Sequence, residues 1–363
     1  MENKLDLARK KINEIDAEMA RLFEERMKAS EEVAEYKKAH GMPIYDPSRE
    51  AEVISRGSLA VSDEGVREYY VSFLKETMSL SRAYQSRLLT GMRIAYCGTE
   101  GAFAHIAACE LFPSAEKIAY DGFDTAYAAV ERGECDACVL PIENSYNGEV
   151  GQVCDLMFSG SLFVNGIKEL MISQDLLAPR GATLEDIKEV VSHPQALGQC
   201  AEFIKQHGFE KKEYSNTALA ARYVKEKGDK TIGAIASAKA ASIFDLDVLV
   251  YNINASQVNT TRFAVFSRIR KKCDERRMGN HSIILFTVKH EAGALAKAIE
   301  IIGRHGFNMK ALKSRPMKEL LWQYYFYVEA EGNIDTPDAK LMLDELRKYC
   351  DKLKVAGTFI KEN

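Results

Sequence analysis

Proline and glycine are absent from the first forty residues, and this absence restricts the fold of the N-terminal region more than any other feature of the sequence. Residues that suit one buried face recur at helical spacing: Ile12, Ile15, Met19, Leu22, Ser30 and Val33. The pattern predicts one amphipathic helix from Lys4 to about His40, ended by Gly41 and Pro43. Such a helix would be about 50 Å long, too long to stand in a small domain without partner helices.

Two further helices are predicted before residue 91. Asp46 and Pro47 form an N-cap and first-turn pair that starts a short second helix. A third helix is predicted from about Asp63 to Leu89. Three helices of such unequal length cannot easily close a core, so we expect residues 1–90 to form an all-helical domain that dimerises.

Three cations, Arg9, Arg26 and Lys37, interrupt the apolar stripe of the first helix. Inward charges are costly unless they meet an anion, so these residues indicate a site for an anionic molecule. Arg26 and Lys37 would lie on one face, about 16 Å apart along the axis. Arg9 would be about 25 Å from Arg26, so a pocket that uses all three needs Arg9 from a second chain.

With a polar cluster downstream, these cations give residues 4–89 a resemblance to the all-helical chorismate mutases. The residues that carry it are Arg9, Arg26, Lys37, Asp46, Arg49, Glu50, Ser81 and Gln85. The resemblance implies an intertwined dimer that binds chorismate. It also implies carboxylate binding by Arg9 of one protomer with Arg26 and Ser81, catalysis at the ether oxygen by Lys37 and Gln85, and a ring-hydroxyl contact from Glu50. A Claisen rearrangement needs positioned donors rather than a proton shuttle.

After Gly91 the pattern changes to strands that alternate with helices, beginning at Arg93–Cys97, so a domain boundary is expected near residue 91. The turn GTEGAF at 98–103 matches neither GxGxxG nor a P-loop, which argues against a nucleotide. Its backbone could receive a carboxylate at a helix N-terminus. Two more strands run into polar turns, at 143–148 and 192–197.

The stretch NTTRFAVFSR, residues 259–268, reads as a strand that begins with four polar side chains. Together with the three turns it makes residues 92–270 closely resemble the prephenate dehydratases. That family has two α/β lobes, like the periplasmic binding proteins, with prephenate in the cleft. The implied substrate-binding residues are Glu143, Asn144, Ser145, Gln195, Thr261 and Arg262.

Thr261 is the predicted acid, because loss of CO₂ and hydroxide needs chiefly a donor at the leaving oxygen. His105 and His193 are rival acids, and His193 could instead orient the turn before Pro194. The chain has GTEGAFA where the family more usually shows GPxGTFS, so two hydroxyl donors are missing from the first turn.

Residues 280–363 follow a charge-rich linker at 271–277 and predict the order β-α-β-β-α-β of the ferredoxin-like α+β arrangement. Strands are expected at 281–288, 308–315, 322–331 and 355–360, and helices at 292–304 and 337–352. The segment resembles an ACT domain that binds phenylalanine, which implies effector contacts from Gly293, Ala294, Leu295, Ser314, Arg315 and Pro316. Lys313 stands where that family has Glu.

Composition excludes several classes of function. The chain has 363 residues, 46% of them hydrophobic, without an apolar run of 18 residues, so we expect no membrane partner. A net charge of −4 with dispersed cations argues against nucleic acid. Cys135 and Cys138 form the one CxxC, without the second pair that zinc requires, so no metal or cofactor is expected. The charged N-terminus and scattered cysteines suggest a cytoplasmic protein.

The sequence therefore predicts a bifunctional enzyme of phenylalanine synthesis that responds to phenylalanine and forms a homodimer or larger homo-oligomer. One alternative is an arogenate or prephenate dehydratase whose helical domain only dimerises. The other is a two-lobed solute-binding or sensor protein without catalysis.

Overall fold

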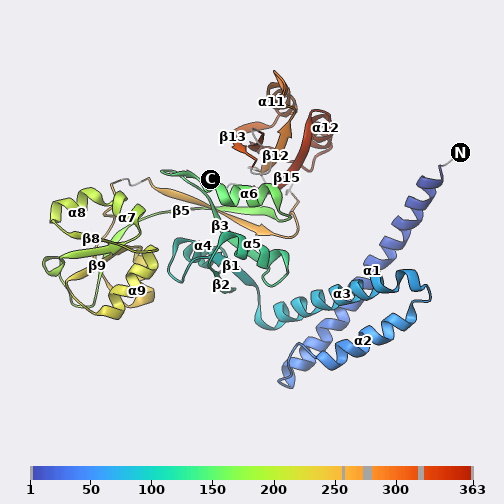
Figure 1. Ribbon diagram of the computed structural model, residues 1–363, viewed down its shortest axis with the longest axis horizontal. Helices are drawn as coiled ribbons and strands as arrows, with labels where there is room; N and C mark the ends of the chain where they lie inside the picture. Colours follow the sequence, from blue (N-terminus) through green and yellow to red (C-terminus); the bar gives the residue numbers. More distant parts are fainter. Residues whose placement is uncertain (1–2, 256–257, 273–279, 318–322, 361–363) are drawn as a thin grey trace. The chain divides into compact units, whose positions relative to one another are not determined.

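A computed structural model describes residues 3–255, 258–272, 280–317 and 323–360 (Figure 1). Contacts between residues divide the chain into two compact units, Met1–Arg93 and Ile94–Asn363. We describe each unit by itself. The linker residues 273–279, including Cys273, and the predicted strand start at Trp322 lie outside the described residues.

The first unit is helical, and its helices begin at the residues that can cap them. They are α1 (Lys4–Ala39), α2 (Pro47–Ala60) and α3 (Glu64–Thr90). The Asp46 side chain accepts a hydrogen bond from the backbone N of Arg49 at 3.0 Å, and Asp63 accepts from Gly65 at 2.8 Å. Helix α3 packs against both α1 and α2. The three predicted helices are confirmed.

The apolar stripe of α1 is exposed within this chain. Ser30 and Ala34 are the buried residues of the helix. The side of α1 that carries the larger apolar residues stays open to solvent: Ile12, Ile15, Met19, Leu22 and Val33 are each more than 40% exposed. The helical unit thus leaves a long apolar surface that its own three helices do not cover.

The second unit begins with two α/β lobes (Figure 1). The first lobe contains β1 (Arg93–Cys97), β2 (Glu116–Tyr120), β3 (Ala137–Asn144), β4 (Gly148–Glu149), β5 (Phe163–Met171), β11 (Thr260–Ser267), α4 (Phe103–Leu111), α5 (Phe123–Glu131) and α6 (Gly151–Ser159). The second lobe is inserted between β5 and β11. It contains β6 (Asp175–Ala178), a 3₁₀ turn (Leu184–Asp186), β7 (Glu189–Ser192), α7 (Pro194–Gln199), α8 (Ala201–His207), β8 (Glu210–Glu213), α9 (Thr217–Lys227), β9 (Ile232–Ala236), α10 (Ala238–Phe244) and β10 (Asp247–Val250).

The sheet order explains how the lobes meet. Strand β11 lies between β5 and β3, antiparallel to both, and β3 is followed by β1 and β2. The second lobe has its own sheet, in the order β10-β6-β9-β7-β8. The chain therefore crosses between the lobes twice, after β5 and before β11, and the crossing segments bring polar residues to the lobe boundary.

The C-terminal segment has the predicted order of elements, but its last helix and its last strand have different bounds. Its elements are β12 (Asn280–Val288), α11 (Ala294–Arg304), β13 (Asn308–Pro316), β14 (Tyr324–Glu331), α12 (Pro337–Leu346) and β15 (Cys350–Ile360). The order β13-β14-β12-β15 is the ferredoxin-like arrangement. The predicted helix 337–352 was too long and the last strand too short, because Cys350 already pairs with Val288 of β12.

The C-terminal sheet continues into the sheet of the first lobe. Gly357 of β15 lies beside Val164 of β5 in parallel register, which gives a sheet of ten strands among the described residues. A Cβ atom on Gly357 would collide with the backbone of Val164, so the close approach requires glycine at this position.

Candidate functional site

In the helical unit, α1 and α3 bring three predicted site residues together. Arg26 donates a hydrogen bond to the Ser81 hydroxyl. Gln85 lies one turn further along α3, is 8% exposed, and its buried Oε1 has no hydrogen-bond partner among the described residues. Lys37 extends from the same helix as Arg26 and donates to the backbone carbonyl of Ile44 at 2.5 Å. Cationic and amide side chains of this kind suit a small anionic molecule.

The three predicted site residues around the start of α2, Asp46, Arg49 and Glu50, have different contacts. Asp46 caps α2, and Arg49 pairs with Glu52 at the exposed surface at 2.6 Å. Glu50 pairs with Arg82 of α3, a residue that the sequence analysis missed although it follows Ser81 directly. Arg82 also lies over the Tyr45 ring at 5.4 Å.

Arg9 lies far from this cluster. Its side chain is 68% exposed and 3.9 Å from Asp6. Arg26 lies seventeen positions further along the same continuous helix, about 25 Å along the axis. One protomer therefore does not bring Arg9 to the residues that surround Gln85.

In the second unit, a cavity of about 280 Å³ opens between the two lobes. The first lobe contributes Asn144, Glu149 and Thr261 to its wall, and the second contributes His193, Gln195 and Gln199. The crossing segments contribute Gln174 and Asn259. Predicted site residues from three distant parts of the sequence thus meet at one cavity.

Asn144 organises this cavity. Its Nδ2 donates to Thr261 Oγ1 at 2.9 Å and to Asn259 Oδ1 at 2.8 Å. Its Oδ1 accepts from the backbone N of Tyr146 and of Asn147, each at 3.0 Å, which fixes the orientation of the amide. Because Thr261 Oγ1 is the acceptor in its contact with Asn144, its own proton remains available. No acceptor for that proton appears among the hydrogen bonds of the described residues.

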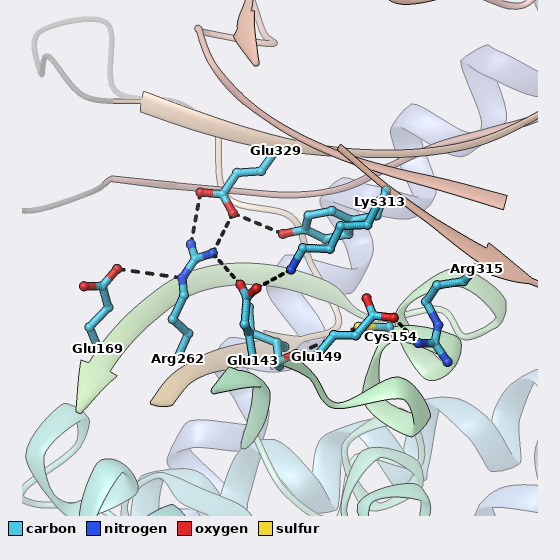
Figure 2. A network of polar contacts seen from close by, with 10 residues as sticks. Glu143, Glu149, Cys154, Glu169, Arg262, Lys313, Arg315 and Glu329 are labelled. Atoms are coloured by element: carbon cyan, nitrogen blue, oxygen red, sulfur yellow. Dashed lines mark hydrogen bonds and ion pairs between the residues drawn. The ribbon is translucent and has the colours of Figure 1, made fainter. Parts of the chain in front are cut away.

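Glu143 and Arg262 point away from the cavity. Thr261 stands opposite Asn144 in the β11–β3 register, and Arg262 stands opposite Glu143. Successive side chains of a strand point to opposite faces, so the second pair lies behind the first. Figure 2 shows Arg262 and Glu143 directed toward Glu329 and Lys313 of the C-terminal domain. The expectation that all four residues face one cleft must be corrected on this point.

The charges behind the cavity satisfy one another. Arg262 donates to both oxygens of Glu329, at 2.9 and 3.0 Å, and lies 3.4 Å from Glu143. Burial disfavours the Glu143 carboxylate, but hydrogen bonds and charge from Lys313 and Arg262 outweigh burial and lower the pKa of Glu143. Burial likewise opposes the Arg262 charge, and Glu329 reverses that effect and raises the pKa of Arg262.

Ser145 and the two rival histidines have structural contacts. Ser145 Oγ accepts from the backbone N of Thr260 at 2.9 Å and donates to Val258 O at 3.1 Å, so it holds the start of β11. His193 lines the cavity and caps α7, accepting from the Gln195 backbone N at 3.2 Å. His105 accepts from the backbone N of Gly101 at 3.2 Å, and burial lowers the pKa of its ring.

Of the polar cavity residues that were not predicted to bind substrate, Gln174 and Asn259 are the most deeply buried. Gln174 and Asn259 are each 3% exposed, and Gln174 Oε1 and Asn259 Nδ2 have no hydrogen-bond partner among the described residues. Asn259 is the first of the polar residues at the start of the stretch NTTRFAVFSR, so its place in the sequence could have indicated a site residue. Gln174 lies in a crossing segment without a motif, and the tertiary structure alone brings it to the cavity wall.

A second cavity, of about 560 Å³, lies in the C-terminal domain. Gly293 and Leu295 line it, and Gly293 caps α11 with φ +83°, directly before Ala294. Strand β13 has Lys313 and Arg315 half-buried and Ser314 and Pro316 exposed. Lys313 pairs with Glu143, and Arg315 pairs with Glu149 and with Asp155, so both cations face the first lobe.

The CxxC residues belong to the core of the first lobe. Cys138 lies inside β3 and is fully buried, and burial raises the pKa of its thiol. Among the described residues no three of His, Cys, Asp and Glu gather as a metal would require. No helix in the described ranges is long and apolar enough to cross a membrane.

Comparisons with known proteins identify the class of each part. A family model for chorismate mutase type II matches residues 8–86, and one for prephenate dehydratase matches residues 94–271. A bifunctional chorismate mutase/prephenate dehydratase of Aquifex aeolicus is 33% identical over 362 residues, which cover 97% of each chain. This chain belongs to the family of bifunctional chorismate mutase/prephenate dehydratases.

Two further relatives cover the second unit. Arogenate dehydratase 2 of Petunia hybrida is 34% identical over 282 residues, which are 74% of this chain and 71% of the plant protein. The crystal structure of prephenate dehydratase from Arthrobacter aurescens in complex with L-Phe is 26% identical. It covers 74% of this chain and 90% of its own, with a TM-score of 0.67.

Proposed function

We propose that this protein converts chorismate to prephenate in its helical unit and prephenate to phenylpyruvate, CO₂ and water between its two lobes. The observation that carries the second step is the Asn144–Thr261 contact at the cavity wall, which leaves the threonine proton available. The first step is supported by the group formed by Arg26, Ser81 and Gln85, with Lys37 on the same helix as Arg26. A helical domain that only dimerised would not need these polar residues beside a buried, unpartnered amide oxygen.

In the mutase step the protein binds the compact conformer of a dianion and stabilises charge that develops on the ether oxygen. We assign that oxygen to Lys37 and Gln85, and the carboxylates to Arg26 and Ser81. Arg9 would join the carboxylate contacts from a second protomer. The exposed apolar stripe of α1 supports a dimer, because a second chain would cover it.

In the dehydratase step Thr261 donates its proton to the leaving ring hydroxyl, which departs as water. At the same time the bond between the ring and its carboxylate breaks and CO₂ leaves. The electron pair of that bond completes the aromatic ring. Thr261 then regains a proton from solvent. Asn144 orients the Thr261 oxygen, and Gln195 and Asn259 supply polar contacts for the substrate carboxylates.

We also propose that the C-terminal domain is an ACT domain that binds phenylalanine and reduces dehydratase activity. The cavity beside Gly293, Ala294 and Leu295 supports this assignment. Ser314 and Pro316 lie exposed on β13, and Arg315 faces the first lobe, so the effector assignment rests on the residues at the start of α11. The deeply buried thiols fit the reducing cytoplasm.

The test is to incubate the purified full chain with chorismate and to follow prephenate and phenylpyruvate by chromatography. Both products should form in sequence. Accumulation of prephenate without phenylpyruvate would remove the dehydratase assignment, and conversion of added prephenate without turnover of chorismate would remove the mutase assignment. Arogenate offered beside prephenate at equal concentration measures which dianion the cleft prefers.

A further inference from the structure

The side chains behind the dehydratase cavity belong to the strand positions next to those of the proposed catalytic pair. Thr261 and Asn144 face the cavity, and the adjoining register pair, Arg262 and Glu143, faces the C-terminal domain. Any displacement of Arg262 along or across β11 therefore moves Thr261, because one peptide unit joins them. The contacts behind the sheet can thus fix the geometry of the site in front of it.

Arg262 is surrounded by carboxylates from three strands. Glu143 of β3 and Glu169 of β5 stand opposite Arg262 in the registers of the two neighbouring strands. Their oxygens lie 3.4 and 3.8 Å from the guanidinium. Glu329 of β14 closes the third side with two hydrogen bonds (Figure 2). Tyr327 donates to Glu329 at 3.2 Å.

Lys313 supplies the second cation of this network. Its Nζ lies 2.5 Å from Glu143 Oε1, and its side chain is 26% exposed. Three carboxylates (Glu143, Glu169, Glu329) and two cations (Arg262, Lys313) share the region. Without Lys313, Glu143 would depend on Arg262, which also donates two hydrogen bonds to Glu329.

We propose that Lys313 and Glu329 of the C-terminal domain are positioning residues for the dehydratase reaction. Through Glu143 and Arg262 they hold β3 and β11 so that Asn144 and Thr261 stay in hydrogen-bonding register at the cavity. The inference rests on the proposed role of Thr261. It also gives Lys313 a task other than contact with an amino acid effector, because its ammonium is directed at Glu143.

The burial of each charged side chain in the network decides how strongly its replacement affects the structure. The Glu329 side chain is 4% exposed and that of Arg262 is 17% exposed, so loss of either partner leaves a largely buried charge without its main counter-charge. Lys313→Glu would set two carboxylates against each other across the interface. By contrast, Lys310 on the same strand pairs with Glu331, and both side chains are 45% exposed. An exposed pair of this kind contributes little.

The experiment compares four variants of the full-length chain: Lys313→Glu, Glu143→Lys, the double exchange Lys313→Glu/Glu143→Lys, and the control Lys310→Glu. The two single network variants should lower kcat for prephenate by roughly three- to thirtyfold with little change in KM. The double exchange should recover part of the loss, because it restores an ion pair with position 313 but leaves a like charge facing Arg262. Mutase turnover should stay unchanged in all four and reports that each variant is folded.

Hydrogen exchange gives a readout that does not depend on activity. Backbone amides of β3 and β11 should exchange faster in Lys313→Glu than in the parent or in Lys310→Glu. Wild-type kcat in both single variants, or a double exchange no better than the singles, would overturn the inference. A change in KM alone would assign Glu143 to substrate binding instead. If the parent did not dehydrate prephenate, the proposed function would fail. The hydrogen-exchange comparison would still decide whether the Lys313–Glu143 pair holds β3 and β11 in place.

Discussion

Replacement of Thr261 by alanine should stop dehydration while the cavity keeps its shape. The substitution removes the hydroxyl that accepts from Asn144 Nδ2 at 2.9 Å. Asn144 keeps its bond to Asn259 Oδ1 at 2.8 Å and both backbone contacts to its Oδ1, so its amide should stay in place. The catalytic loss and the structural loss can therefore be separated.

The expected magnitudes follow from these contacts. Loss of one net hydrogen bond lowers the unfolding free energy by about 1 kcal/mol, which corresponds to about 2–4 °C in melting temperature for a domain of this size. Loss of a positioned proton donor lowers the rate by about 10²–10⁴-fold. A stability change this small cannot account for a rate change this large at assay temperature.

The assay measures phenylpyruvate from added prephenate and, separately, prephenate from chorismate. Thr261→Ala should let prephenate accumulate from chorismate at the parental mutase rate, and Thr261→Ser should retain part of the dehydratase activity. Thr260→Ala is the matched control, because Thr260 precedes Thr261 on β11 and its side chain points to the opposite face. If Thr261→Ala kept more than a tenth of parental kcat, another group must supply the proton, and the cavity-lining His193 would be the next candidate.

Four other outcomes are expected. Lys37→Ala should lower mutase turnover about a hundredfold or more and leave dehydration of added prephenate nearly intact, whereas equal loss of both would indicate misfolding. Arg9→Ala and Arg26→Ala should each be inactive as mutases, and mixed, re-equilibrated subunits should regain activity; no recovery after proven exchange would exclude a two-chain site. Phenylalanine should raise the melting temperature of the parent and of Thr261→Ala, and calorimetry without binding would show that the effector assignment is wrong. Burial lowers the pKa of Lys354 from 10.5 to about 8. The unfolded chain then binds more protons between these values, so the Lys354 contribution to unfolding free energy should rise with pH from about 8 to 10.5, and Lys354→Met should flatten this rise in denaturant titrations.

Local sequence rules account for much of the architecture. Three features of the sequence predict elements that the structure contains, with small shifts at their ends. They are the proline-free segment, the caps at Asp46 and Asp63, and the C-terminal β-α-β-β-α-β order. These features succeed because helix periodicity, capping and turn chemistry act over a few residues. The last strand was misjudged because long-range pairing with β12 extends it back to Cys350.

The placement of the site residues is only partly local. Period-two alternation along β11 already implies that Thr261 and Arg262 cannot face the same cavity, so that correction was within reach of the sequence. Which of the two faces the cavity depends on where the inserted lobe and the C-terminal sheet pack against β3 and β11. The same holds for Gln174, which reaches the cavity through a crossing segment.

Lys313 shows most clearly what the sequence determines and what the tertiary structure decides. By itself the sequence determined that a cation stands where the resembled family has an acidic residue. The tertiary structure decided that this cation meets Glu143, 170 positions away in the sequence. Composition and periodicity fix which elements form, because those choices depend on neighbouring residues. The partner of a charged side chain depends on which distant strands share an interface, and the packing of the whole unit settles that choice.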